Sequence, residues 1–375
     1  MRIGLVSTHP PIECGIGTYT QFFREGLDKL NNETFVISQI GGAGNGVFPV
    51  YWPDDADMAK KIFGISTKMT PDIMHIQHEF NLYGTGSSIN IAELLKRYKL
   101  LGLPVVITLH TVFPKLSHEE KTAAEMIMND STAVIVHEEK QKKTLVSYFG
   151  KEEKIHIIPH GIRKVAPVKD ARKKTGLEGK KIILQCGYFR ETKNFHKMVE
   201  IMPQIVEKVP EAVLLIAGKF RLLHSGEYLD KLFGLIRNSP VKENIKVLKG
   251  QFPQHTFDTI ISACDLMVQP YSVGAQSGIM AQAFAFNKPV VTSDLPAFRE
   301  AVEQSGGGLW SADDNEYVEN IVKILTDEKF MADMKSKIAA HVDKLCWEKI
   351  AEKHLEVYEP LVYYPYEGAE HFYAG

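Results

Sequence analysis

This 375-residue sequence lacks the features that would assign it to several large classes of protein. It has no strong charge of either sign, because 44 Lys and Arg side chains nearly balance 46 Asp and Glu, and a net charge of −2 gives no electrostatic reason to expect nucleic acid. The cysteines lie far apart without a C-x-x-C pair, which predicts buried thiols in a reducing compartment; they are Cys14, Cys186, Cys264 and Cys346.

Long hydrophobic runs and metal motifs are also missing. No run of 18 apolar residues occurs, and the short apolar start is interrupted by His9-Pro10-Pro11, which predicts a cytoplasmic protein without a membrane span or signal peptide. The sequence contains no HExxH, no Cys/His cluster and no DxD-like pair at a strand end. We therefore expect no metal site and no bound cofactor.

What the sequence does contain is an alternation of short β-branched runs with amphipathic stretches. In the first half, strands are expected at 2–7, 34–40, 73–77, 104–110, 132–137 and 155–161. In the second half they are expected at 181–189, 212–219, 244–250, 265–270 and 289–293. This alternation predicts βαβ units and parallel sheets, hence an α/β fold with two doubly wound modules.

The polar connector 163–180 separates the two modules, and the chain length independently favours two domains. We expect a first domain over 1–163 and a second over 164–346. Residues 347–375 form a final helix and a tail rich in aromatic side chains.

Ligands of open α/β sheets bind beyond the carboxyl ends of the strands, so the residues directly after each strand are the candidates for a site. Gly15 and Gly17 follow the first strand and open a helix, which suits either an anion or a plain tight turn. His110 follows the fourth strand, where it is either a site residue or a satisfied half-buried side chain. No comparable argument applies to His137.

Two cationic side chains follow the first strand of the second module. Arg190 and Lys193 lie in GYFRETKNF (187–195), just before a helix, and would suit a diphosphate; the alternative is a solvated basic loop. Gly218 and Gly250 end two further strands at the same edge. The stretch 271–291 turns from a polar loop into a small-residue helix, which either binds an anion through its first N–H groups or packs closely on the sheet.

Together these segments resemble the GT-B glycosyltransferases, specifically the large retaining family four. The resemblance covers nearly the whole chain and rests on PPxxCGIGTYT, IQHEFNLYG, VITLHTVF, IIPHGI, GYFRETKNF, SGIMAQAFAFNKPVVTSD and WEKIAEKHLEVY. It implies two Rossmann-like domains facing across a cleft, the first on the acceptor side and the second binding the nucleotide sugar. It also implies that the helix after 347 crosses back onto the first domain.

The same resemblance implies roles for individual residues. Arg190 and Lys193 match the cationic pair that holds the donor diphosphate, and His110 matches a histidine near the transferred sugar. Gly15 and Gly17 match the glycine loop that faces the donor phosphates and acceptor. Residues of the second module complete the expected donor site: Gly218, Gly250, Gln276, Ser277, Gly278, Ile279 and Gln282.

The sequence departs from the family at two positions. Members commonly carry two glutamates eight residues apart, where this chain has Gly274 and Gln282. A related branch with a TQSGVL-like sequence lacks both acids as well, and AQSGIM here is similar to it. Gln282 keeps a side chain able to bind a ribose hydroxyl. Gly274 cannot replace a carboxylate, so contact with the sugar would have to come from backbone amides, Gln276 or Ser277, or be absent.

The expected function is transfer of a hexosyl unit from a GDP- or UDP-sugar to a hydroxyl of a saccharide or lipid-linked acceptor, with retention and without metal. A lipid-linked acceptor would bring the protein to the inner face of the membrane as a peripheral protein. The alternatives are a nucleotide-sugar epimerase, a phosphorylase, or a non-catalytic sugar-binding subunit. Donor base, donor sugar, acceptor, linkage and oligomeric state do not follow from the sequence.

Overall fold

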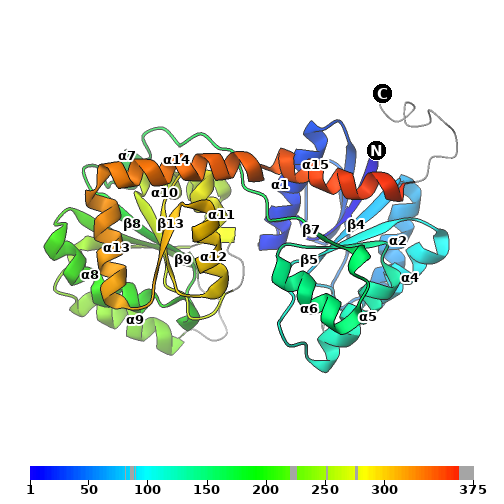
Figure 1. Ribbon diagram of the computed structural model, residues 1–375, viewed down its shortest axis with the longest axis horizontal. Helices are drawn as coiled ribbons and strands as arrows, with labels where there is room; N and C mark the ends of the chain where they lie inside the picture. Colours follow the sequence, from blue (N-terminus) through cyan, green and yellow to red (C-terminus); the bar gives the residue numbers. More distant parts are fainter. Residues whose placement is uncertain are drawn as a thin grey trace. The chain divides into compact units, whose positions relative to one another are not determined.

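The computed structural model describes residues 1–80, 82–84, 88, 90–219, 226–250, 252–274 and 278–362 (Figure 1). The chain divides into two compact units. Unit 1 consists of Met1–Gly161 together with Leu345–Gly375, and unit 2 of Ile162–Lys344. Each unit is built around its own parallel sheet, and each has its own hydrophobic core.

The described residues of unit 1 form a seven-stranded parallel sheet in the order β3-β2-β1-β4-β5-β6-β7. Its strands are β1 (Arg2–Val6), β2 (Glu33–Gln39), β3 (Val47–Tyr51), β4 (Ile73–His78), β5 (Val105–Leu109), β6 (Ala133–Val136) and β7 (Ile155–Ile157). The helices include α1 (Gly15–Lys29), α2 (Met58–Met69), α4 (Ile91–Leu101), α5 (His118–Asp130), α6 (Glu139–Phe149) and α15 (Trp347–Tyr358), with the 3-10 turns η1 (Glu152–Lys154) and η4 (Glu359–Leu361).

The described residues of unit 2 form a six-stranded parallel sheet in the order β10-β9-β8-β11-β12-β13. Its strands are β8 (Lys181–Tyr188), β9 (Ala212–Lys219), β10 (Ile245–Lys249), β11 (Leu266–Gln269), β12 (Val290–Ser293) and β13 (Gly308–Ser311). The helices include α7 (Ala171–Thr175), α8 (Phe195–Lys208), α9 (Gly226–Asn238), α10 (Gln254–Ala263), α11 (Gly278–Ala285), α12 (Pro296–Ser305), α13 (Asp314–Thr326) and α14 (Glu328–Leu345), with η2 (Glu191–Lys193) and η3 (Lys242–Asn244).

The predicted fold class is confirmed, since both units are parallel α/β sheets with helices in the crossovers. Two strands were not predicted, and both lie at a sheet edge. β3 contains Pro49, which has no N–H for a sheet ladder and is tolerated at an edge. β13 is only four residues long and begins with Gly308, so its sequence has little of the β-branched character on which strand prediction depends.

Helix α15 completes the core of unit 1. Its buried residues Trp347, Ile350 and Ala351 belong to the same apolar cluster as Phe22 and Phe23 of α1. The two helices approach closely because α1 has a glycine at the contact: a Cβ on Gly26 would lie 2.6 Å from the backbone oxygen of Trp347. Within the described part of the chain, no helix has both the length and the apolar character needed to cross a bilayer.

Candidate functional site

Each sheet reverses its strand order at one point. Gly15 and Gly17 follow β1 and the pair Arg190 and Lys193 follows β8, both next to a reversal, whereas His110, Gly218 and Gly250 lie at the ends of β5, β9 and β10. In unit 1 the reversal lies between β1 and β4, and in unit 2 between β8 and β11. Crossovers on either side of such a point leave opposite faces of the sheet, which opens a crevice at the carboxyl ends of the two strands. The loops at issue are therefore those after β1 and β4 in unit 1, and those after β8 and β11 in unit 2.

In unit 2, backbone and side-chain hydrogen bonds tie the loop after β8 to the loop after β11. Ser272 donates its N–H to the carbonyl of Thr192 at 2.9 Å, and Asn194 donates its side-chain N–H to the carbonyl of Pro270 at 2.7 Å. Asn194 takes the left-handed conformation that ends η2 and starts α8. These contacts hold η2, with Lys193 at its end, against the carboxyl end of β11.

Lys193 is held by an aromatic side chain from across the crevice. Its ammonium donates to the hydroxyl of Tyr271 at 3.0 Å and lies 4.5 Å from the centre of the Tyr271 ring. Gly187 makes room for it, because a Cβ there would lie 2.5 Å from Nζ. Desolvation lowers the pKa of Lys193, and the nearby charge of Arg190 lowers it further. The phenol that binds this half-buried ammonium is neutral, so it does not compensate the positive charge of Lys193. That charge favours an anionic ligand.

Arg190 is exposed, three residues before Lys193, and its guanidinium lies 5.7 Å from the centre of the Tyr188 ring. Lys219, at the end of β9, approaches the same ring, with its ammonium 6.0 Å from the centre. The structure thus brings three cations to the carboxyl ends of β8 and β9. Two of them are the pair expected from the sequence, and Lys219 extends the group.

The two glycines expected at this edge of the sheet, Gly218 and Gly250, are explained by different features of the structure. Gly218 is buried beside β8, where a Cβ would lie 2.5 Å from the carbonyl oxygen of Gly187, so close packing of strands is sufficient to explain it. Gly250 has a φ of +146°, which residues with a side chain rarely adopt, and no heavy atom of the described residues lies within 4 Å of a built Cβ. Both therefore lie at the predicted edge of the sheet, and their roles toward a ligand stay predictions.

Helix α11 begins at Gly278, which is exposed and has no heavy atom within 4 Å of a built Cβ among the described residues. Ile279 is partly buried, and Ala283 and Ala285 are buried, so this helix packs closely through its small residues. Gln276 and Ser277, both expected at the donor site, lie outside the described residues. The packing interpretation and an anion site at the helix start are therefore compatible.

Gln282 is engaged by an ion pair that the sequence did not predict. Arg163 donates both Nη atoms to the carboxylate of Asp258, at 2.6 and 3.2 Å, and its Nη2 also donates to Oε1 of Gln282 at 2.8 Å. With its oxygen bound to the guanidinium, Gln282 makes no hydrogen bond from its NH₂ group to the described residues, so this group can donate to a ligand. A glutamate at this position would instead place a second carboxylate on Arg163.

In unit 1, Gly15 and Gly17 lie in the first turn of α1, directly after the β1 loop. The side chain of Cys14 makes no capping hydrogen bond at this helix start. Gly15 is exposed, whereas Gly17 is buried, and a Cβ on Gly17 would lie 3.3 Å from the Thr8 hydroxyl. The first turn of the helix thus lies close against the end of β1, as the tight-turn interpretation requires, and an open helix start remains for an anion.

His110 follows β5 and is surrounded by other rings. Tyr19 of α1 packs edge-on against it with ring centres 4.7 Å apart, and Tyr19 packs in the same way on His160 and Trp347. His160 accordingly has a packing role. His137 lies with Nε2 3.2 Å from Nδ1 of His110, so a residue without any argument from the sequence is a direct neighbour of a predicted one.

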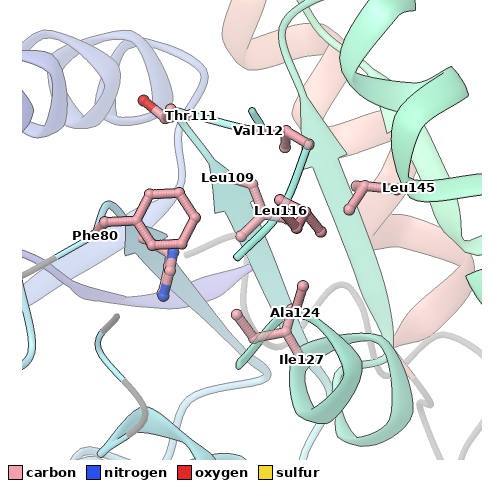
Figure 2. Close-up of a pocket in the computed structure, with 9 residues that line it drawn as sticks. Phe80, Leu109, Thr111, Val112, Leu116, Ala124, Ile127 and Leu145 are labelled. Carbon is pink, nitrogen blue, oxygen red and sulfur yellow. The ribbon is translucent and has the colours of Figure 1, made fainter. Parts of the chain in front are cut away.

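His78 ends β4, and Glu79 follows it in the chain. His78 is one of the residues that line a small apolar pocket, and Figure 2 shows the labelled side chains around this pocket. The Glu79 carboxylate accepts from the Thr111 hydroxyl at 2.7 Å and from the Phe80 N–H at 2.9 Å, and burial raises its pKa. The pocket has a cavity volume of about 10 Å³, which is room for one water molecule. It is lined by His78, Phe80, Leu109, Thr111, Val112, Leu116, Ala124, Ile127 and Leu145.

Two family models match the chain, one for each half. "Glycosyltransferase Family 4" matches residues 15–164 and "Glycosyl transferases group 1" matches residues 167–341. Among curated relatives, phosphatidyl-myo-inositol mannosyltransferase of Mycolicibacterium smegmatis is 26% identical over 207 residues, which are 54% of this chain and 51% of that one. Spore coat protein SA of Bacillus subtilis is 23% identical over 201 residues, 51% of this chain and 52% of that one. The chain thus spans about half the length of these curated relatives.

Solved structures extend the likeness to the whole fold. Anabaena Alr3699/HepE in complex with UDP has a TM-score of 0.75 at 15% identity and covers 96% of this chain and 99% of its own. Sucrose-phosphate synthase from Thermosynechococcus elongatus has a TM-score of 0.74 at 19% identity, with coverage of 96% and 99%. At these identities the likeness establishes the fold of both units.

Proposed function

We propose that this chain, which belongs to the family 4-like glycosyltransferases of GT-B fold, transfers a hexosyl unit from a nucleotide-diphosphate sugar to an acceptor hydroxyl. The observation that carries the proposal is the half-buried ammonium of Lys193, held by Tyr271 next to Arg190 at the strand-order reversal of unit 2. UDP is the first nucleotide to test, since UDP complexes are known among the structural neighbours.

In the proposed reaction, the bond between C1 of the sugar and the diphosphate oxygen breaks, and the diphosphate leaves with the electron pair. Arg190, Lys193 and the N–H groups at the start of α11 stabilise the charge that develops on it. The acceptor oxygen then bonds to C1 on the face that the diphosphate left, so the configuration is retained. The leaving phosphate takes the acceptor's proton, which requires neither a covalent nucleophile from the protein nor a metal ion.

The remaining roles divide between the two units. His110 orients the transferred sugar, and Gly15 and Gly17 allow the phosphates and the acceptor to approach the start of α1. Gln282 donates its NH₂ group to the nucleotide ribose, with Arg163 holding the amide in that orientation. The acceptor is a saccharide or a lipid-linked hydroxyl, and the mannosyltransferase relative, whose name includes a phosphatidyl group, supports including lipid-linked acceptors. A lipid-linked acceptor would bring the protein to the inner membrane face as a peripheral protein.

The test is a thermal-shift panel of UDP, GDP, ADP and their common sugars, with and without EDTA. We expect one nucleotide family to stabilise the protein, insensitively to EDTA, and an Arg190→Ala/Lys193→Ala double variant to lose the effect. The matched control is Lys208→Ala/Arg237→Ala, which removes the same charge from exposed positions on α8 and α9. A folded wild-type protein that ignores every nucleotide would favour a non-catalytic subunit instead.

A further inference from the structure

A continuous row of polar groups, all buried except the partly exposed His110, runs under the carboxyl ends of β4, β5 and β6. It begins at the carbonyl of Ile158, which lies 2.8 Å from Nδ1 of His137. Nε2 of His137 lies 3.2 Å from Nδ1 of His110, and Nε2 of His110 lies 2.8 Å from Oε1 of Gln77. Nε2 of Gln77 lies 3.3 Å from Nε2 of His75.

The row ends on helix α15. Nδ1 of His75 is hydrogen-bonded to the hydroxyl of Tyr358, and Nε2 of His75 lies 2.7 Å from the hydroxyl of Thr108. His75 and Tyr358 are fully buried, as is Gln77 between His75 and His110. Every ring nitrogen in the row therefore has one protein neighbour or more, and none depends on solvent.

The position of each proton follows from the first group. A carbonyl can only accept, so His137 carries its proton on Nδ1, and its Nε2, if the ring is neutral, must accept. His110 then donates from Nδ1, which leaves its own Nε2 as an acceptor. The structure places the Gln77 oxygen toward His110 and the NH₂ group toward His75. A row of neutral rings requires the two ends of this amide to be exchanged, so that the NH₂ group donates to His110 and the oxygen faces His75. His75 donates from Nε2, with its proton shared between the Thr108 hydroxyl and the Gln77 oxygen, and accepts from Tyr358 at Nδ1, so the row needs no charged ring.

With the amide oxygen toward His110, as in the structure, the facing nitrogens of His110 and His137 can share a proton only if one of the two rings donates from both nitrogens and becomes an imidazolium. Burial opposes this: it lowers the pKa of His137 to about 3 and holds the pKa of His110 well below its ordinary range. The titratable groups around His110 are neutral rings, His75, His78, His137, His160 and Tyr19, and the Glu79 carboxylate is bound by Thr111 instead.

We propose that His137 and Gln77 are positioning residues that hold His110 as a neutral ring protonated on Nδ1, with both nitrogens occupied. This inference rests on the proposed function, because it concerns the protonation and orientation of His110 next to the transferred sugar. A ring held in this way orients the sugar through its fixed position and takes no part in proton transfer. The acceptor's proton is then left to the departing phosphate.

The direct test is long-range ¹H–¹⁵N spectroscopy of the full-length protein with ¹⁵N-labelled histidine rings, with single His110→Asn and His137→Asn variants for assignment. At pH 7 we expect neutral Nδ1–H signals for His110 and His137 and a neutral Nε2–H signal for His75. An Nε2–H or imidazolium signal for His110 in the wild-type protein would overturn the proposal. This measurement needs no ligand, so its outcome is independent of whether the protein binds a nucleotide.

A second arm tests the role in turnover. Gln77→Glu places a carboxylate, which only accepts, beside Nε2 of His110, so the ring should become an imidazolium in the same spectra. Gln77→Met removes the hydrogen bond without adding charge and is the matched control. With UDP-glucose as the probe, we expect Gln77→Glu to lower kcat about tenfold, with a UDP dissociation constant unchanged within about twofold, because UDP is assigned to unit 2. Unchanged turnover in a folded variant carrying the imidazolium would overturn the positioning role.

Discussion

Lys193 depends on the Tyr271 hydroxyl, and this dependence can be measured separately from the charge itself. Tyr271→Phe keeps the ring beneath the ammonium and removes the hydroxyl to which it donates. Loss of one such hydrogen bond should weaken UDP binding roughly three- to tenfold, as measured by calorimetry at pH 7.5. The control is Tyr188→Phe, whose ring faces Arg190. Equal effects of the two substitutions would contradict a specific role for the Tyr271 hydroxyl.

The pH dependence of UDP binding should report the same lysine. Because burial lowers the pKa of Lys193, its ammonium loses the proton at a lower pH than an exposed lysine. Binding should therefore weaken as the pH rises, and in Tyr271→Phe this weakening should begin at a lower pH, since the hydroxyl stabilises the charged form. Calorimetric titrations from pH 7 to pH 10 measure it. An affinity that stays constant over this range would contradict the assignment of Lys193 to the diphosphate.

At the residue scale, the sequence predicted which strands end in candidate residues but not which partners hold them. Arg190 and Lys193 follow a strand directly, and this position is visible in the sequence. Tyr271 is 78 positions beyond Lys193, and Arg163 is 119 positions before Gln282. Such pairs depend on the order of strands in the sheet, which a single sequence does not reveal. His137 was missed for the same reason.

At the scale of elements, two glycines in helix interiors should respond in opposite ways to the same substitution. Gly26→Ala brings a Cβ to 2.6 Å from the Trp347 backbone oxygen, so we expect a net destabilisation of about 1–3 kcal/mol through overpacking. Gly64→Ala, in α2, meets no heavy atom of the described residues within 4 Å and should stabilise by about 0.5–1 kcal/mol through helix propensity.

Urea unfolding of the two alanine variants provides the measurement, and Gly64→Ala is the control for helix propensity alone. If Gly26→Ala stabilised the protein as much as Gly64→Ala, this result would contradict the close contact between α1 and α15. The comparison also tests whether the close contact between α1 and α15 contributes to the stability of unit 1.

Prediction of elements succeeded where burial leaves a clear signal. Strands such as β5 and β9 are buried almost throughout, and their runs of apolar residues stand out in the sequence. The edge strand β3 is buried only at its two ends, Val47 and Tyr51, and is exposed at Pro49, so its pattern resembles that of a loop. Fold class is therefore predictable from the central strands, while the edges of each sheet are not.

At the scale of the whole molecule, acid should destabilise the two units unequally. Burial lowers the pKa of His78 and His354 to about 4 and that of His137 to about 3, and all three lie in unit 1. Below the ordinary histidine pKa of about 6.5, the unfolded chain binds these protons and the native state does not, so stability falls as the pH falls. Three such groups correspond to about 4 kcal/mol for each pH unit between about 6 and 5.

Hydrogen exchange with mass spectrometry at pH 7, 6 and 5 would measure this loss unit by unit. We expect protection in β4, β5 and β6 to decrease with acid before protection in β8 and β9 decreases. The histidines of unit 2 with lowered pKa values, His196 and His341, are not fully buried, so unit 2 serves as an internal control. Equal loss in both units would contradict the assignment of acid sensitivity to the buried histidines.

Helix α15 also has a consequence for how the protein is made. Unit 1 begins with Met1–Gly161, but its core is completed by a helix that follows all of unit 2 in the chain. At roughly 5–20 residues per second, a ribosome needs on the order of ten seconds or more to reach α15 after finishing Gly161. During that interval the apolar face of α1, with Phe22 and Phe23, has no partner helix. The nascent chain should therefore be a chaperone client until its last helix emerges, while unit 2 can already fold.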